Sequence, residues 1–281
     1  MMTVLTAGRS VPGRIAHARR DFDPRTLPPD DLVAQDALEL HTVAITDARD
    51  AADGLVLDDD GFALRQFPTA TTDFFDLDHV ESTYLPEVTA LVRDLSGASA
   101  AVVLEQVIRG PRSMAREHPD YGRQLLGWAL KAHVDADEAT FREWAAHVAE
   151  PELVSQCRTE PFAVYNVWRP IAPVQRMPLA FCHAPTVRPQ DLVPAHFDGR
   201  FPGTPEDEYY PTVRYFHLAF NPDQRWYYFR DMQPQEVAVF KQWDSDGSRA
   251  RCVPHTAFED PTSSPGAPPR QSIEVRVFAL R

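Results

Sequence analysis

The chain ends in two extended segments, Pro254-His255-Thr256-Ala257-Phe258 and Arg270-Gln271-Ser272-Ile273-Glu274-Val275-Arg276-Val277-Phe278. Polar and apolar residues alternate in the second segment, which is typical of a β-strand. Residues 261–269 between them are rich in proline and predict a stiff loop rather than a helix. The C-terminal region is therefore predicted to place a histidine on one strand and an Arg-x-Ser pair at the start of the next.

Several short strands precede this unit. β-branched and aromatic runs predict strands at residues 162–168, 178–182, 213–220, 225–229 and 236–243, with the last strand over 272–280. Two of them, 213–220 and 225–229, are expected to form a hairpin around Asn221-Pro222-Asp223. Arg169-Pro170 is expected to end the strand before them, because proline cannot donate to a ladder.

Helices are expected mainly in the first half. Apolar residues with helical spacing predict a helix over 76–96, with Gly97 as its C-terminal cap, and a second helix over about 138–148. Strands are predicted at 41–45 and 101–104, and a hairpin joins 55–57 to 62–64 through a turn that ends at Gly61. Many strands with few helices predict a β-sandwich or jelly roll flanked by helices.

Composition limits the classes of function. The chain has 281 residues, 43% of them hydrophobic, which suffices for a sizeable core. Its net charge of −13 disfavours a nucleic-acid or anionic-membrane partner. Cys157, Cys182 and Cys252 lie far apart and suggest no disulfide framework, so a reducing cytoplasm is expected. No apolar run is long enough for a signal peptide or a membrane span.

A metal site is suggested by a His-x-Asp pair. On an extended segment both side chains point to the same face, because strand side chains alternate. His133 and Asp135 have this spacing, and His255 can supply a third ligand from a distant strand. Two histidines and one carboxylate leave three coordination positions open, which suits Fe(II) with a chelating cosubstrate and O₂.

The spacing is not unique to this pair. Three further pairs have it: His79 with Glu81, His118 with Asp120, and His196 with Asp198. The first lies at a helix start, and a proline within the second indicates a turn. The third precedes several strands before His255, so from spacing alone it stays an alternative to His133 and Asp135.

The Arg-x-Ser pair suggests a carboxylate-binding site. Arg270 and Ser272 share one face of the last strand, where the planar arginine fork can bind a carboxylate and the hydroxyl can add a further bond. Arg276 lies on the same face and is a second candidate for this role. The structural alternative is that Arg270 and Glu274 form an ordinary surface pair.

The chain resembles a known family at several motifs. These are Tyr165-Asn166-Val167-Trp168-Arg169-Pro170-Ile171, Met177-Pro178-Leu179-Ala180-Phe181-Cys182, Arg225-Trp226-Tyr227-Tyr228 with Pro234-x-Glu236-Val237, and the C-terminal His255 to Glu274 region. Together they resemble the gibberellin desaturase and cephalosporin hydroxylase (CmcJ) group of iron and 2-oxoglutarate-dependent oxidases. The resemblance extends from about Gly61 onward. One departure is His183, where relatives carry Asp.

The resemblance implies a single oxygenase domain over 1–281 of the α+β class. A double-stranded β-helix (jelly-roll or cupin-like) core with flanking helices would occupy about 76–281, after a β-rich N-terminal extension at 1–75. It selects His133 and Asp135 over His196, and implies Fe(II) on His133, Asp135 and His255. Arg270 and Ser272 would then hold 2-oxoglutarate.

The implied reaction is oxidation of an unactivated C–H bond in a natural-product biosynthetic intermediate, by hydroxylation, desaturation or oxidative cyclisation. The partners would be a small-molecule substrate and O₂. Trp168, Arg169, Tyr227 and Tyr228 are candidates for the pocket wall or for support of the ligands, with core packing as the alternative for each, and Arg276 is a further candidate for such support or for the pocket. Two other classes stay open: a zinc-dependent hydrolase using the same three ligands, and a non-catalytic scaffold.

Overall fold

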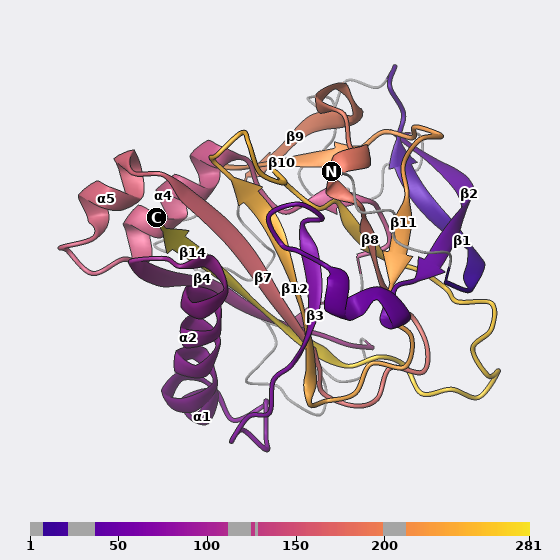
Figure 1. Ribbon diagram of the computed structural model, residues 1–281, viewed down its shortest axis with the longest axis horizontal. Helices are drawn as coiled ribbons and strands as arrows, with labels where there is room; N and C mark the ends of the chain where they lie inside the picture. Colours follow the sequence, from indigo (N-terminus) through magenta and orange to yellow (C-terminus); the bar gives the residue numbers. More distant parts are fainter. Residues whose placement is uncertain (1–7, 22–36, 112–124, 127–128, 199–211) are drawn as a thin grey trace.

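Three strands of the second half are buried at every residue: β7 (Phe162–Pro170), β12 (Glu236–Asp244) and β14 (Ser272–Leu280). A strand that is buried on both faces must have layers packed on each side. The computed structural model describes residues 8–21, 37–111, 125–126, 129–198 and 212–281 (Figure 1). In it these strands lie at the centre of a six-stranded sheet.

The two sheets have a jelly-roll arrangement. The six-stranded sheet has the order β3-β12-β7-β14-β4-β5, with β3 at Phe62–Gln66, β4 at Ala100–Arg109 and β5 at Leu125–Leu126. The eight-stranded sheet has the order β1-β2-β11-β8-β13-β6-β10-β9. Its strands are β1 (Ser10–Ala18), β2 (Leu38–Asp47), β6 (His133–Val134), β8 (Leu179–Cys182), β9 (Leu192–Asp198), β10 (Thr212–Leu218), β11 (Trp226–Tyr228) and β13 (His255–Ala257).

Eight of these strands form the core. Four belong to the six-stranded sheet (β4, β7, β12, β14) and four to the other (β6, β8, β11, β13). The chain passes repeatedly from one sheet to the other, as it does in a double-stranded β-helix. The predicted jelly-roll core is confirmed. The remaining strands extend the sheets: β1 and β2 add to one edge of the eight-stranded sheet, and β3 adds to the six-stranded sheet.

The helices bury their apolar faces against the six-stranded sheet. A short helix α1 (Leu77–His79) continues through a π-helical turn (Val80–Tyr84) into α2 (Leu85–Ser96), which ends at Gly97 with φ of +67°. Its buried Val88 and Val92 belong to the same apolar cluster as β14 residues. Helices α4 (Glu138–Val148) and α5 (Val154–Thr159) lie together at one end of the molecule (Figure 1). The predicted helices over 76–96 and 138–148 are confirmed.

Two predicted hairpins are wrong. Residues 62–66 pair with β12 instead of with 55–57, although Gly61 does adopt the positive φ (+88°) expected of the turn. Strand β10 pairs with β6 and β9, whereas β11 pairs with β2 and β8. In both cases the strand pairs with segments distant in the sequence instead of with its sequence neighbour. The strand predicted over 162–168 also continues through Pro170, where the ladder to β14 ends.

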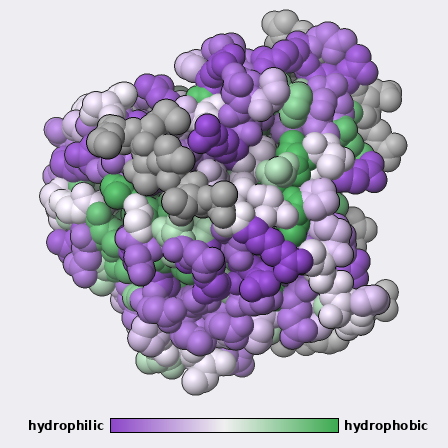
Figure 2. Space-filling model, turned by 45° about the vertical axis from the view of Figure 1, so that its right-hand side comes forward, coloured by the Kyte–Doolittle hydropathy of each residue, from purple (hydrophilic) through white to green (hydrophobic). Residues whose placement is uncertain are grey.

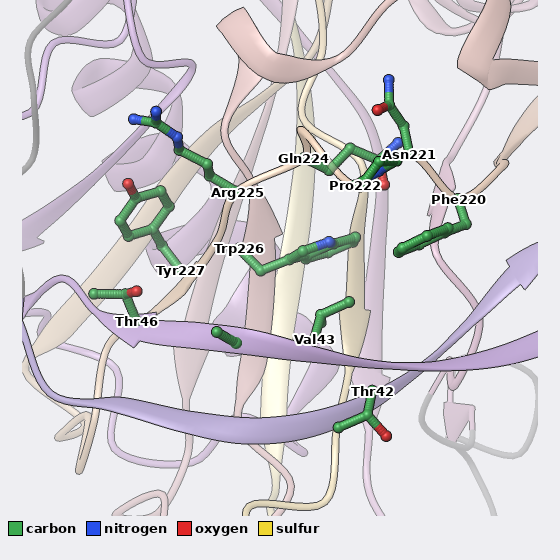
Figure 3. A pocket seen from close by; sticks show the side chains of 11 residues that line it. Thr42, Val43, Thr46, Phe220, Asn221, Pro222, Gln224, Arg225, Trp226 and Tyr227 are labelled. Carbon is green, nitrogen blue, oxygen red and sulfur yellow. The ribbon is translucent and has the colours of Figure 1, made fainter.

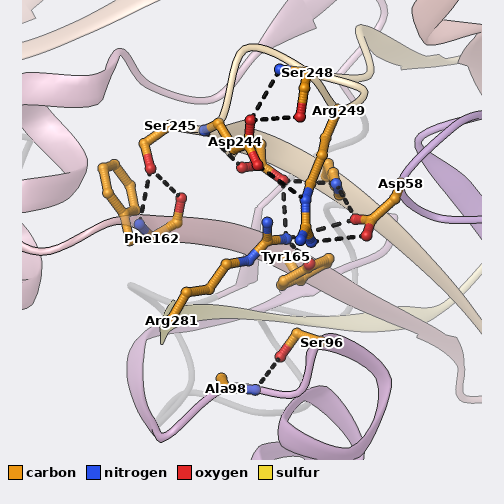
Figure 4. A network of polar contacts seen from close by, with 12 residues as sticks. Asp58, Ser96, Ala98, Phe162, Tyr165, Asp244, Ser245, Ser248, Arg249 and Arg281 are labelled. Carbon is orange, nitrogen blue, oxygen red and sulfur yellow. Dashed lines mark hydrogen bonds and ion pairs between the residues drawn. The ribbon is translucent and has the colours of Figure 1, made fainter.

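A buried ion-pair network closes the outer side of β12 (Figure 4). The fully buried Lys241 ammonium lies 2.6 Å from Asp58 and 2.7 Å from Asp244. Arg281 contacts Asp244 at 2.9 Å, and Arg249 contacts Asp58 at 2.7 Å. Each buried charge therefore has an opposite charge beside it, which burial requires. The network joins the 58–61 turn to the C-terminus.

The surface fits the acidic composition. The face in Figure 2 is mostly hydrophilic, with hydrophobic residues gathered in small patches. Large exposed apolar side chains among the described residues are few and scattered: Leu40, Val56, Leu130 and Val148. Across the described ranges, no helix combines the length and apolar character needed to cross a bilayer.

The buried imidazole of His17 predicts acid sensitivity. It bonds the Ile15 carbonyl at 3.1 Å and packs edge-on against Trp226 at 5.9 Å. Burial, aided by nearby His41 and only partly opposed by the bond to Ile15, lowers its pKa to about 4. The unfolded chain therefore takes up a proton first as pH falls, so stability present above about pH 6.5 is lost toward pH 4.

We expect His17 to account for about 2 kcal/mol of the stability lost between pH 7 and pH 5. Urea unfolding at both pH values, on the wild type and on His17→Gln, measures this. Because glutamine does not titrate, the variant should lose that much less free energy of unfolding on acidification. An equal loss in both proteins would contradict the assignment.

Candidate metal centre

Strand pairing brings the two predicted histidine ligands together. Strand β6 lies between β10 and β13, and His133 is directly opposite His255 on the neighbouring strand. Residues directly opposite in a ladder point to the same face, so both rings face the six-stranded sheet. Their centroids are 4.5 Å apart, and His255 packs on Phe240 of that sheet at 4.8 Å. Two residues separated by 122 positions thus share one site.

Asp135 completes the site where the chain leaves β6. Its Oδ1 lies 3.2 Å from His133 Nε2 and 3.6 Å from His255 Nε2. One ligand atom from each of the three residues lies within 4.8 Å of the others. The three predicted ligands thus lie close together in the structure. Two imidazole nitrogens and one carboxylate oxygen form the donor set that suits non-haem Fe(II).

Hydrogen bonds orient both rings for a metal. His133 Nδ1 donates to the Lys131 carbonyl at 2.8 Å, and His255 Nδ1 donates to the Val253 carbonyl at 3.3 Å. With the proton held on Nδ1, each Nε2 presents its lone pair to the site. Burial, and then the charge of His133, lowers the pKa of His255 to about 4. The ring is therefore neutral at physiological pH, as a metal ligand must be.

The second oxygen of Asp135 is already occupied by protein donors. Oδ2 accepts from Arg276 Nε at 2.6 Å and from Asn166 Nδ2 at 3.0 Å, while the Asp135 N–H donates to Gln242 at 3.0 Å. Burial alone would raise the pKa of the Asp135 carboxyl. The Arg276 charge and the histidines outweigh burial and hold that pKa well below its usual range. The carboxylate stays ionised, with one oxygen toward the histidines.

An alternating chain of charges leads away from Asp135 along the six-stranded sheet. Arg276 contacts Glu105 and lies 3.0 Å from Glu274, which in turn lies 3.0 Å from Arg109. Burial would raise the pKa of Glu274, but the Arg109 and Arg276 charges lower it below its ordinary value. The surface-pair alternative for Glu274 is therefore wrong, because this carboxylate is buried and joins two other arginines.

Ser272 is the first residue of β14, Arg270 lies two residues before it, and both are buried. The Arg270 guanidinium donates to the Met177 carbonyl at 2.9 Å and stacks over the Trp168 ring at 5.2 Å. Burial, and then the charge of Arg109, lowers the pKa of Arg270 to about 9, so it remains a cation at neutral pH. Ser272 Oγ has no hydrogen-bond partner within the described part of the chain, although it is fully buried.

The candidates Trp168 and Arg169 lie on opposite faces of β7. Trp168 shares a face with Asn166 and supports Arg270, whereas Arg169 points to the opposite face because side chains alternate. Arg169 bonds Tyr84 at 3.0 Å and backbone carbonyls of Phe67 and Pro234, which ties β7 to α2 and its neighbouring loops.

Tyr227 is directly opposite Phe181 and shares the face of the triad, whereas Tyr228 packs edge-on against Phe258 on the other face. His183 binds Asp60 at 2.8 Å in the core. It is therefore the buried hydrogen-bond partner of that carboxylate.

Two of the other His-x-acid pairs, at His79 and His196, are not part of this site. His196 is exposed on β9, the edge strand of the eight-stranded sheet, and β10 separates it from β6. His79 lies in α1, as expected. His118 and Asp120 fall outside the described residues.

Sequence reasoning missed several residues around the ligands. Asn166 was identifiable as a lone amide in a run of apolar strand residues, because a buried amide requires a partner. His217 gave no such signal, yet it is directly opposite His133 on β10, and its Nε2 lies 3.1 Å from the Tyr215 hydroxyl. Burial, and then the charges of Lys131 and His133, lowers the pKa of His217 to about 2. This ring is neutral as well.

A separate cavity of about 350 Å³ opens where β2 and the 220–225 loop diverge (Figure 3). Its walls come from β2 on one side and from the loop and β11 on the other, with the rings of Phe220 and Trp226 labelled in the figure. None of the three ligands lines it.

Comparisons with known proteins agree with this geometry. A family model described as "Oxidoreductase/YMDC permease-like domain" matches residues 20–280. The Fe(II)/2-oxoglutarate-dependent dioxygenase nvfI of Aspergillus novofumigatus is 30% identical over 246 residues, covering 85% of this chain and 83% of the relative. The hydroxylase/desaturase asaB of Aspergillus flavus is 37% identical over 189 residues, covering 63% of this chain and 79% of the relative.

A solved structure of the iron and alpha-ketoglutarate-dependent endoperoxidase NvfI has a TM-score of 0.80 to this chain at 26% identity, covering 98% of this chain and 99% of that one. These findings confirm the resemblance seen in the sequence and give no support to a zinc hydrolase. Together with the His-Asp-His site, they place the chain in the family of Fe(II)/2-oxoglutarate-dependent dioxygenases.

Proposed function

We propose that residues 1–281 act as one oxygenase domain that oxidises an unactivated C–H bond of a natural-product biosynthetic intermediate. The observation that carries this proposal is the convergence of His133, Asp135 and His255 on one point. Bound Fe(II) and 2-oxoglutarate would together supply the activation of O₂. The protein would hold both groups, place the substrate C–H bond and exclude water.

His133 Nε2, His255 Nε2 and Asp135 Oδ1 would hold the iron. Because Oδ2 of Asp135 is already bonded to Arg276 and Asn166, that carboxylate offers one oxygen rather than two. A site with three protein ligands keeps three positions for the cosubstrate and O₂. Arg276 thus supports a metal ligand, which leaves Arg270 as the better candidate for the cosubstrate.

Arg270 and Ser272 would hold the distal carboxylate of 2-oxoglutarate. A buried hydroxyl without a partner in the described residues is costly unless a ligand satisfies it, and the buried Arg270 cation beside it favours an anionic ligand. Stacking on Trp168 and the bond to Met177 fix the guanidinium plane, so that its remaining donors are oriented in advance.

Arg270→Ala tests this assignment. Loss of a charge-assisted carboxylate contact worth about 3 kcal/mol should weaken 2-oxoglutarate binding roughly 100-fold. Anaerobic titration of the Fe(II)-loaded protein, followed through the visible charge-transfer band of the chelate, measures the change. Arg176→Ala is a matched control, since Arg176 forms only an exposed pair with Glu259. Equal affinity in both variants would contradict the role of Arg270.

The substrate is proposed to be a small molecule. Hydroxylation, desaturation and oxidative cyclisation need the same ligand set, so the outcome depends on how the substrate is placed. The relatives named above include a hydroxylase/desaturase and an endoperoxidase, which fits this dependence. We also propose a cytoplasmic enzyme without nucleic-acid or membrane partners. The three buried cysteines are free thiols, in keeping with a reducing compartment.

A further inference from the structure

Three polar side chains form a wall beside the metal ligands: Lys131, Tyr215 and His217, called here the polar wall. His217 stands opposite His133, on the side away from His255. Side chains opposite in an antiparallel pair have Cβ atoms about 5 Å apart. Tyr215 lies two residues along β10 on the same face, and Lys131 Nζ is 5.4 Å from its ring centroid. The polar wall therefore adjoins the metal ligand His133.

Lys131 has no counter-charge among the described residues, unlike the buried cations Arg276 and Lys241. Arg276 has Asp135, and Lys241 has Asp58 and Asp244. No carboxylate among the described residues lies within ion-pair distance of the partly buried Lys131 ammonium. The chain has 26 arginines and two lysines, and the other lysine is the fully buried Lys241. A cation in such a place favours an anion as its ligand.

His217 also has unused hydrogen-bonding capacity. Its ring is 5% exposed, Nε2 bonds the Tyr215 hydroxyl, and Nδ1 has no partner within the described ranges. When the tyrosine hydroxyl donates to Nε2, Nδ1 carries the proton and requires an acceptor. An ammonium group and an N–H donor then lie on one wall, and both suit an oxygen anion.

We propose that the polar wall binds an anionic oxygen of the organic substrate, either a carboxylate or a deprotonated enol or phenol. This inference rests on the proposed oxygenase function and specifies its substrate class as a weak acid. The cosubstrate residues Arg270 and Ser272 lie on the other sheet, so the two anions have separate sites. Binding at the wall would hold the substrate next to His133 and fix which C–H bond faces the metal.

Lysine labelling tests the proposal directly, because Lys131 is the one partly exposed lysine of the chain. The Fe(II)- and 2-oxoglutarate-loaded protein is treated anaerobically at neutral pH with formaldehyde and cyanoborohydride, and labelling of the Lys131 peptide is followed by mass spectrometry. The probes are benzoate, 1-naphthoate and farnesoate, each compared with its methyl ester. Lys241 should remain unlabelled and serves as an internal check of folding.

We expect at least one acid to slow labelling of Lys131 by about tenfold at about ten times its Kd, while its ester has no such effect. Equal protection by acid and ester, or no protection by any acid, would overturn the proposal. Protection by 2-oxoglutarate alone, compared with the protein lacking it, would assign the wall to the cosubstrate and also overturn it.

A second arm uses Lys131→Met and Lys131→Arg. Both should bind 2-oxoglutarate like the wild type, and only Lys131→Arg should retain the change that the acid causes in the charge-transfer band. If the acid still changes the charge-transfer band of the methionine variant, the proposed anion site at the polar wall is contradicted. If the band never forms in the wild type although the acid still protects Lys131, the oxygenase function fails while the anion site stands.

Discussion

His255→Ala is expected to reduce Fe(II) affinity by more than about 100-fold. Removal of a residue that only hydrogen-bonds to a metal ligand usually causes a smaller loss. The variant should also lose 2-oxoglutarate turnover. His255 supplies one of three ligand atoms, and two remaining ligands leave a site that holds the metal weakly. Anaerobic reconstitution followed by iron analysis measures the first effect, and succinate formation from 2-oxoglutarate measures the second.

The matched control is His196→Ala. His196 belongs to the competing His-x-Asp pair, but it is exposed on the edge strand β9. This variant should bind iron and consume 2-oxoglutarate like the wild type. If it instead loses iron and His255→Ala retains it, the metal site is misassigned. A scaffold protein would show no turnover in any of these proteins, including the wild type.

Arg276→Met is expected to lower metal affinity by about 10- to 100-fold, the range found for partners that orient a ligand. The substitution removes the 2.6 Å contact to Asp135 Oδ2 and leaves only the Asn166 amide on that oxygen, so Oδ2 can compete for the metal more readily. A carboxylate bound through two oxygens would occupy one more coordination position. The Co(II)-substituted protein reports this change through its d–d absorption, independently of catalytic activity.

Loss of folding must be separated from loss of ligand orientation. Removing one partner of a buried ion pair costs about 3–5 kcal/mol, because Asp135 would remain buried without its cation, while Glu274 would keep only Arg109. Arg169→Met provides the control: it removes a buried arginine that bonds Tyr84 and two carbonyls on the other face of β7. That variant should lose stability yet keep the Co(II) spectrum. Equal spectral changes in both variants would indicate general destabilisation.

The sequence alone identified the features that depend on interactions between residues close together in the chain. Helical spacing followed by Gly97 marked the helix and its end, and the His-x-Asp spacing marked two ligands that share a face. These features depend on neighbours in the chain, and so a single sequence contains them. The choice of His133 and Asp135 over His196 required the family resemblance, because both pairs satisfy the same spacing.

Only the tertiary structure decided which distant segments meet. Strand pairing placed β3 against β12 and separated β10 from β11, since a ladder is selected by burial of whole strand faces rather than by proximity in sequence. Alternation placed Arg270 and Arg276 on one face, but only packing brought Arg276 to Asp135 and Arg270 to Trp168. Likewise, His217 became a neighbour of His133 through a ladder between residues 84 positions apart.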